Sequence, residues 1–168
     1  GYDIFIAINY DPGTKEYNKT ADRLYERFAA QGSRVFFAPV EIPDADDIEA
    51  EPHVYRALSS AGQMVVYVSS ADDAKELRLI NALGRYHALV SAGLKDENSI
   101  VVAYSDMSAD ELPAILKRYP SFFIKGSEKA EESAEETLAV VVDADTEIAD
   151  EQAESLPEEQ EIAPESTL

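Results

Sequence analysis

The sequence predicts an α/β domain in which helices cover both faces of a parallel sheet. Five short apolar runs alternate along the chain with segments whose apolar residues recur at helical spacing. The runs lack the polar alternation of half-exposed strands, as expected of strands that are buried on both faces. Strands that alternate with helices form a parallel sheet through right-handed crossovers. We therefore expect a doubly wound, flavodoxin-like, five-stranded parallel sheet.

The first half of the chain contains two strands and two helices with clear boundary signals. Pro12 and Gly13 mark a turn, Gly32 and Gly62 mark helix ends, and Pro52 suits the first turn of a helix. The expected elements are a strand at 2–8, a helix at about 20–31 capped by Asn18 or Thr20, a strand at 33–38, a loop with two prolines and several acids, and a helix at 49–61.

The second half begins with the most apolar strand in the chain, at 64–70, which a long helix follows. The residues at their junction are of helix-capping types: Ser69, Ser70, Asp72 and Asp73. The helix is expected to begin among them and to run to about residue 92, where Gly93 ends it. The remaining expected elements are a strand at 99–105, a short helix at 109–119 that Pro113 interrupts, a strand at 121–125 and a helix at 128–144.

Most of the negative charge belongs to the end of the chain. The formal net charge is −20, of which residues 1–126 carry −6 and residues 127–168 carry −14. We expect one folded domain at 1–143 and an acidic tail at 144–168, read as a disordered linker or otherwise as a partner-binding arm. Because the basic residues are scattered singly, nucleic-acid binding is not expected.

The composition also indicates the cellular compartment. The chain has no cysteine, which excludes disulfides and thiolate metal sites and favours a reducing compartment. No apolar run approaches the roughly 18 residues that a membrane span needs, and no basic-then-apolar leader is present. We therefore expect a cytoplasmic protein without membrane contacts.

Several common kinds of site do not fit the sequence. In the loop after the first strand Gly13 precedes Thr14, whereas a phosphate loop requires Gly-Lys-Ser/Thr at the start of the helix. A phosphoacceptor receiver needs an Asp at the end of the third strand, where Ser69 stands. His53 and His87 lie on separate expected helices, so we expect no metal site.

Several ordered matches resemble a Toll/interleukin-1 receptor (TIR) domain of the bacterial kind. They cover about residues 2–124 and comprise YDIFIAI, RVFFAPVEIPD, EPHVYRALSSAGQMVVYVSS and RLINALGRYHALV. Enzymes of that family cleave or cyclise NAD⁺ at the bond between nicotinamide and ribose, in bacterial immune or abortive-defence signalling. The resemblance thus implies NAD⁺ as a substrate and no separate cofactor.

The resemblance also implies where the catalytic carboxylate belongs. In the bacterial pattern Asn-Glu-Trp-Ser-Arg, the Glu supports the oxocarbenium-like centre. Aligning Asn81 and Arg85 without gaps places Ala82 at the position of this Glu. A methyl group cannot hydrogen-bond a ribose or stabilise positive charge, so we expect the chain to be inactive as it stands. Glu76, six residues upstream, would point about 120° away on a continuous helix.

Two explanations of Ala82 remain open. The chain is either a natural pseudoenzyme that works by assembly or the product of a deliberate Glu→Ala change. The intact neighbours Asn81, Arg85 and Tyr86 favour the second. The first corresponds to the alternative function, a non-enzymatic TIR scaffold that acts through self-association.

Other site positions follow from the same resemblance. Substrate-binding positions would be Ile8, Asn9, Phe37, Ser69, Asn81 and Arg85. Phe37 is equally compatible with a plain core position and Ser69 with a helix cap. The family's assembly loop, which contacts other TIR domains, corresponds to residues 39–47 and includes Pro39, Glu41, Asp44 and Asp47. The loop is unusually acidic here.

Overall fold

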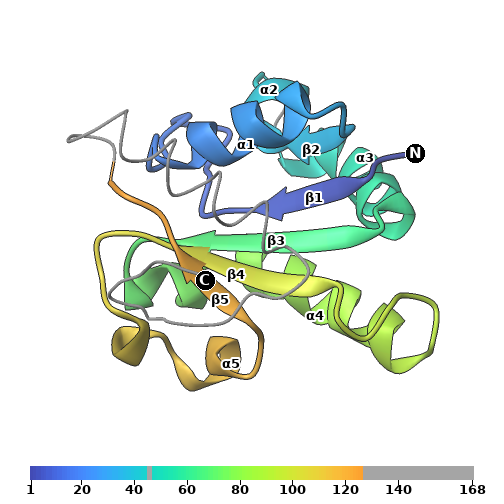
Figure 1. The fold of residues 1–168 in the computed structure, drawn as a ribbon. Helices are drawn as coiled ribbons and strands as arrows, with labels where there is room; N and C mark the ends of the chain where they lie inside the picture. The colour runs from blue at the N-terminus through green and yellow to red at the C-terminus, as the bar shows by residue number, and fades with distance from the viewer. Residues whose placement is uncertain (45–46, 127–168) are drawn as a thin grey trace.

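A computed structural model describes residues 1–44 and 47–126 (Figure 1). The five strands are β1 (Ile4–Ala7), β2 (Val35–Phe37), β3 (Gln63–Val68), β4 (Ile100–Tyr104) and β5 (Ser121–Phe123). All pairs are parallel and the strand order is β2-β1-β3-β4-β5. This is the flavodoxin-like order, so the predicted fold class is confirmed. The expected helix at 128–144 and the domain boundary near residue 143 lie outside the described residues.

Helices lie on both faces of this sheet. The helical elements are α1 (Ala21–Ala30), α2 (Ala38–Glu41), α3 (Asp47–Ser60), η1 (Ala71–Lys75), α4 (Leu77–Ser91), η2 (Ala109–Glu111) and α5 (Ala114–Lys117). One core cluster joins α3, α4 and α5 to one face, and a second joins α1 to the other. Gly32 and Gly93 have φ angles of 91° and 79°, which is the left-handed conformation that ends a helix.

β1, β2 and β4 lie within the predicted apolar runs, whereas β3 begins one residue before its run and β5 at the first residue of its run. Along β3, Met64, Val66 and Val68 join the cluster under α3 and α4, whereas Val65 and Tyr67 join the cluster under α1. All five side chains are buried because each face of the central strand is covered. This arrangement explains why the runs show no polar alternation.

The structure corrects the predicted start of the long helix. α4 begins at Leu77 rather than among residues 69–73, and the short helix η1 lies between it and β3. The carboxylate of Glu76 caps α4 by accepting the N–H groups of Arg78 and Leu79 at 3.0 and 3.2 Å. Ser70 precedes η1 without a side-chain capping bond. Glu is a less common cap than Ser or Asp, so sequence signals favoured the wrong positions.

The segment after β2 is also more helical than predicted. The short helix α2 begins at Ala38, expected to end the second strand, and otherwise occupies residues that were expected to form a loop, with Pro39 in its first turn. α3 begins at Asp47, two residues earlier than predicted, so Pro52 lies inside the helix and not in its first turn. Helical structure therefore occupies both ends of the predicted assembly loop.

Candidate functional site

Two cavities meet at the carboxyl ends of the central strands. From β1 the chain crosses to β2 on one side of the sheet, while the strands after β3 follow on the other side. The crevice beyond β1 and β3 is therefore the topological switch point, where flavodoxin-like proteins bind ligands. Ile8, directly after β1, lines both cavities. We call them the polar cavity and the apolar cavity.

The polar cavity lies between the loop after β1 and the loop after β3, and its volume is about 600 Å³. Its walls carry amide, hydroxyl and carboxylate groups from both loops. The residues that line it are Ile8, Asn9, Asp11, Thr14, Glu16, Tyr17, Asn18, Tyr67, Ser69 and Asp73. Such a lining suits a ligand rich in hydroxyl groups, such as a sugar.

Asp73 connects the two loops that form the polar cavity. Its carboxylate accepts hydrogen bonds from the Asn9 side-chain amide at 3.0 Å and from the Ser69 N–H at 2.7 Å. Asn9 follows β1, and Ser69 follows β3. The width of the cavity thus depends on one carboxylate that bridges the ends of neighbouring strands.

A buried hydroxyl pair lies beneath the polar cavity. Tyr67 is 3% exposed, and its hydroxyl lies 2.6 Å from the Ser105 hydroxyl. Ser105 donates to the Asp106 carboxylate at 2.9 Å, so the Tyr67 hydroxyl is the donor to Ser105. Burial, above all, raises the pKa of Tyr67 above its ordinary value. Tyr67 therefore contributes a neutral aromatic wall at physiological pH.

The apolar cavity lies between α2, α3, α4 and the strands β1 and β2, and its volume is about 300 Å³. Core side chains form most of its lining: Phe5, Ile6, Ala7, Ile8, Tyr10, Pro12, Phe36, Ala38, Ile42, Ala50, Val54, Leu58, Leu79 and Ala82. Its remaining lining is polar or aromatic: Glu51, Tyr55, Arg78, Asn81 and Arg85. An apolar interior with a few polar groups is typical of small-molecule sites.

The polar part of this lining includes an aromatic contact. The Arg85 guanidinium lies over the Tyr55 ring, 4.1 Å from its centroid. Tyr55 in turn donates a hydrogen bond to the Glu51 carboxylate, and this bond raises the pKa of Tyr55. Arg85 and Tyr55 therefore link α4 to α3 beside the apolar cavity.

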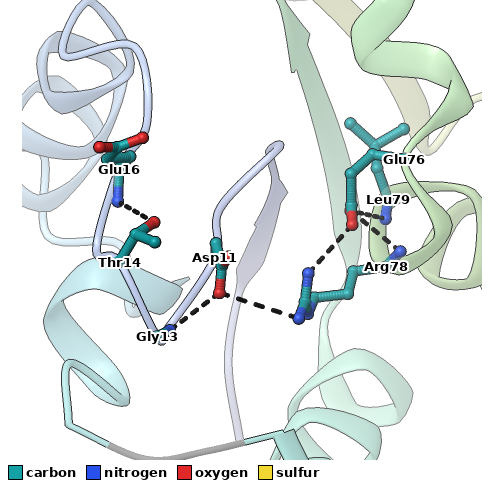
Figure 2. Close-up of polar contacts among 7 residues, drawn as sticks. All are labelled: Asp11, Gly13, Thr14, Glu16, Glu76, Arg78 and Leu79. Carbon is teal, nitrogen blue, oxygen red and sulfur yellow. Dashed lines mark hydrogen bonds and ion pairs between the residues drawn. The ribbon is translucent and has the colours of Figure 1, made fainter.

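An ion pair stands between the two cavities. Figure 2 shows Asp11, in the loop after β1, facing Arg78 near the start of α4. The Arg78 Nη2 atom lies 4.0 Å from the Asp11 Oδ1 atom, and Arg78 Nη1 lies 3.0 Å from a Glu76 carboxylate oxygen. Asp11 lines the polar cavity and Arg78 the apolar cavity, so their contact marks the boundary.

The structure divides the predicted substrate-binding residues between the cavities. Asn9 and Ser69 line the polar cavity, whereas Asn81, Ala82 and Arg85 line the apolar cavity. Ile8 joins the two groups. Ala82 is half-buried and packs at the edge of the core, with no hydrogen-bonding group of its own.

Phe37, predicted as a substrate-binding position or a plain core position, lines neither cavity. Its side chain is 0% exposed, and its ring stacks on Tyr25 with 5.1 Å between the centroids. Phe37 points to the α1 face of the sheet, opposite to its neighbour Phe36. Side chains alternate along a strand, so the residue on the α3 side is Phe36, which does line the apolar cavity.

The predicted assembly loop has several internal contacts. Glu41 accepts a hydrogen bond from the Tyr2 hydroxyl at 2.8 Å, and Asp44 forms an ion pair of 2.6 Å with Lys15. Pro39 and Glu41 belong to α2, and Asp47 is the first residue of α3. The apolar side chain of Val40 is 48% exposed on this surface.

Several residues that line the cavities were not predicted as site residues from the sequence. Asp11, Arg78 and Asp73 received no role in binding. A usable signal exists, since polar residues directly after the first and third strands of such a fold face its ligand crevice. Arg78 had no such signal, because its place depends on where α4 begins.

The described residues contain no group of three or more His, Asp or Glu side chains that could hold a metal ion. In the same part of the chain, no helix is both long and apolar enough to cross a membrane. No protein-family model matches the sequence, and no curated protein matches it either.

Proposed function

We propose that the chain is a TIR-like domain whose paired cavities bind NAD⁺ and which does not turn it over because Ala82 stands in place of a catalytic Glu. The observation that supports this proposal is the position of Asn81, Ala82 and Arg85. All three line a cavity that meets the β1/β3 switch point at Ile8. The proposal combines this geometry with the resemblance in the sequence.

The contribution that Ala82 cannot make is the electrostatic stabilisation of the ribose. Cleavage of the nicotinamide–ribose bond leaves positive charge on the ribose, and a carboxylate within hydrogen-bond reach stabilises that charge and orients the hydroxyls. The methyl group of Ala82 does neither. Glu76 does not replace it, because its carboxylate is engaged by the N–H groups of Arg78 and Leu79 and by the Arg78 side chain.

The direct test restores the carboxylate with Ala82→Glu. The matched control is Ala88→Glu, which makes the same change at an exposed position of the same helix. NAD⁺ and nicotinamide are followed by chromatography at low and high protein concentration, so that assembly can complete the site. We expect nicotinamide release with Ala82→Glu and none with the unaltered chain, Ala88→Glu or Ala82→Gln.

The unaltered chain should nevertheless bind NAD⁺, which calorimetry measures directly. Absence of both binding and turnover, with Ala82→Glu folded by circular dichroism, would overturn the proposal. If sedimentation shows that the same sample self-associates, the non-enzymatic scaffold becomes the better description. The exposed side chain of Val40 beside the predicted assembly loop is the feature that favours this second function.

A further inference from the structure

The boundary between the two cavities is formed by a weak contact. Arg78 and Asp11 are separated by 4.0 Å, and their side chains are 42% and 52% exposed. An ion pair that is this long and this exposed contributes little to stability, because water competes for both charges. The contact between Asp11, which lines the polar cavity, and Arg78, which lines the apolar cavity, is therefore one that a ligand can displace.

Both partners keep other interactions when the pair separates. Asp11 also accepts the N–H of Gly13 at 2.9 Å. Arg78 is also held by Glu76, whose carboxylate contacts Nη1 at 3.0 Å, while the Nη2 atom lies 4.0 Å from Asp11. When the pair separates, Asp11 therefore keeps its hydrogen bond from Gly13 and Arg78 keeps its contact with Glu76 (Figure 2). A new anion on the Nη2 side would meet a guanidinium that is already oriented.

We propose that Arg78 is a phosphate-binding residue, and that the phosphate of a ligand spanning both cavities replaces Asp11 on its guanidinium. The inference rests on the proposed function for the identity of the ligand. A dinucleotide has two nucleoside halves joined by a pyrophosphate. With one half in each cavity, its pyrophosphate lies at the boundary, where Arg78 supplies a positive charge.

The chemistry of the boundary suits this exchange. A guanidinium offers a planar set of N–H donors that matches two phosphate oxygens, and its hydrogen bonds to phosphate are charge-assisted. The carboxylates around it act against an anion, since Asp11, Glu16 and Asp73 all line the polar cavity. Glu76 also lies 3.0 Å from the Arg78 Nη1 atom. Asp11 contacts Arg78 at Nη2, where the phosphate would bind, so neutralising Asp11 should strengthen phosphate binding.

The test measures binding of three probes by calorimetry: NAD⁺, inorganic pyrophosphate and nicotinamide riboside, which has no phosphate. Arg78→Gln should weaken binding of NAD⁺ and pyrophosphate about tenfold and leave nicotinamide riboside unchanged. Arg78→Lys should restore part of the loss, because it keeps the charge without the planar geometry. Asp11→Asn should tighten binding of both phosphate ligands several-fold.

Arg118→Gln is the matched control, because it removes the same charge at an exposed residue that lines neither cavity. Thermal unfolding of each variant checks that the fold is kept. Binding of NAD⁺ that is equal in Arg78→Gln, Arg118→Gln and the unaltered chain would overturn the inference and leave the proposed function standing.

The experiment also distinguishes a failure of the proposed function from a failure of this inference. If pyrophosphate binds and depends on Arg78 while NAD⁺ does not bind, the inference stands and the proposed function fails. If neither phosphate compound binds the unaltered chain or Asp11→Asn, Arg78 is not a phosphate-binding residue. Equal weakening of nicotinamide riboside in Arg78→Gln would also overturn the inference, since it would indicate a general distortion of the site.

Discussion

The two cavities are built in different ways, although they meet at Ile8. The apolar cavity has walls of core side chains, such as Phe36, Leu58 and Leu79, which also join the sheet to α3 and α4. The polar cavity has walls of loop residues that a few hydrogen bonds hold together, above all those to Asp73. The shape of the first is therefore tied to the stability of the fold, whereas the shape of the second is set more locally.

The largest effect is expected in the apolar wall. Leu79→Ala should lower the free energy of unfolding by about 2 to 5 kcal/mol, because Leu79 is 1% exposed and its removal enlarges an existing cavity. Urea unfolding measures the change. Leu77→Ala is the control on the same helix, since Leu77 is 70% exposed and should matter little. Similar losses of unfolding free energy in the two variants would contradict the conclusion that the wall of the apolar cavity is part of the core.

A smaller and more local effect is expected in the polar wall. Asp73→Ala removes the acceptor for Asn9 and Ser69 and should cost about 1 to 2 kcal/mol. Hydrogen exchange of the Ser69 amide should accelerate more than exchange in β3. Asp72→Ala is the neighbouring control, because Asp72 makes only an exposed ion pair with Lys75 among the contacts described for it. If hydrogen exchange accelerated equally across the whole sheet, the bonds to Asp73 would stabilise the fold as a whole and not the polar cavity alone.

The smallest effect concerns Tyr67 beneath the polar cavity. Tyr67→Phe should cost about 0.5 to 1.5 kcal/mol near neutral pH, because Ser105 keeps its bond to Asp106. Burial raises the pKa of Tyr67, so the tyrosine ionises more readily in the unfolded chain. Stability should therefore fall as pH rises from about 10 through the higher folded pKa.

Tyr67→Phe should reduce this loss of stability at alkaline pH without abolishing it. Burial also raises the pKa values of other tyrosines, Tyr10 and Tyr86 among them. Urea unfolding between neutral and alkaline pH gives the profile. Tyr25→Phe is a suitable control because it removes a half-buried hydroxyl from α1, away from both cavities. If the free energy of unfolding fell with pH as steeply in Tyr67→Phe as in the unaltered chain, the buried Tyr67 hydroxyl would not contribute to the alkaline loss of stability.

The fold was predictable because it depends on patterns that repeat along the chain. Apolar runs such as the one around Val66 are buried on both faces, and this property alone indicates a covered parallel sheet. The start of α4 was not predictable in the same way. It depends on whether Glu76 or Asp73 turns its carboxylate toward free N–H groups, and Asp73 is engaged by Asn9, which is 64 residues earlier.

The candidate site was predictable only in part. Ile8, Asn9 and Ser69 follow strands directly, so their positions at the crevice follow from topology. The resemblance does not say which of the adjacent Phe36 and Phe37 faces the α3 side of the sheet, so the position of Phe37 could not be predicted from it. Arg78 and Asp11 were missed because their pairing joins a loop to a helix start, and sequence spacing does not encode that distance.

The lengths of the outer strands limit how copies of this domain can meet. β2 and β5, at the two edges of the sheet in the described part of the chain, have only three residues each. A short edge offers few free N–H and C=O groups to an incoming strand, which protects against runaway sheet extension. Helices and loops, rather than strand edges, are therefore the surfaces through which copies of this domain would associate.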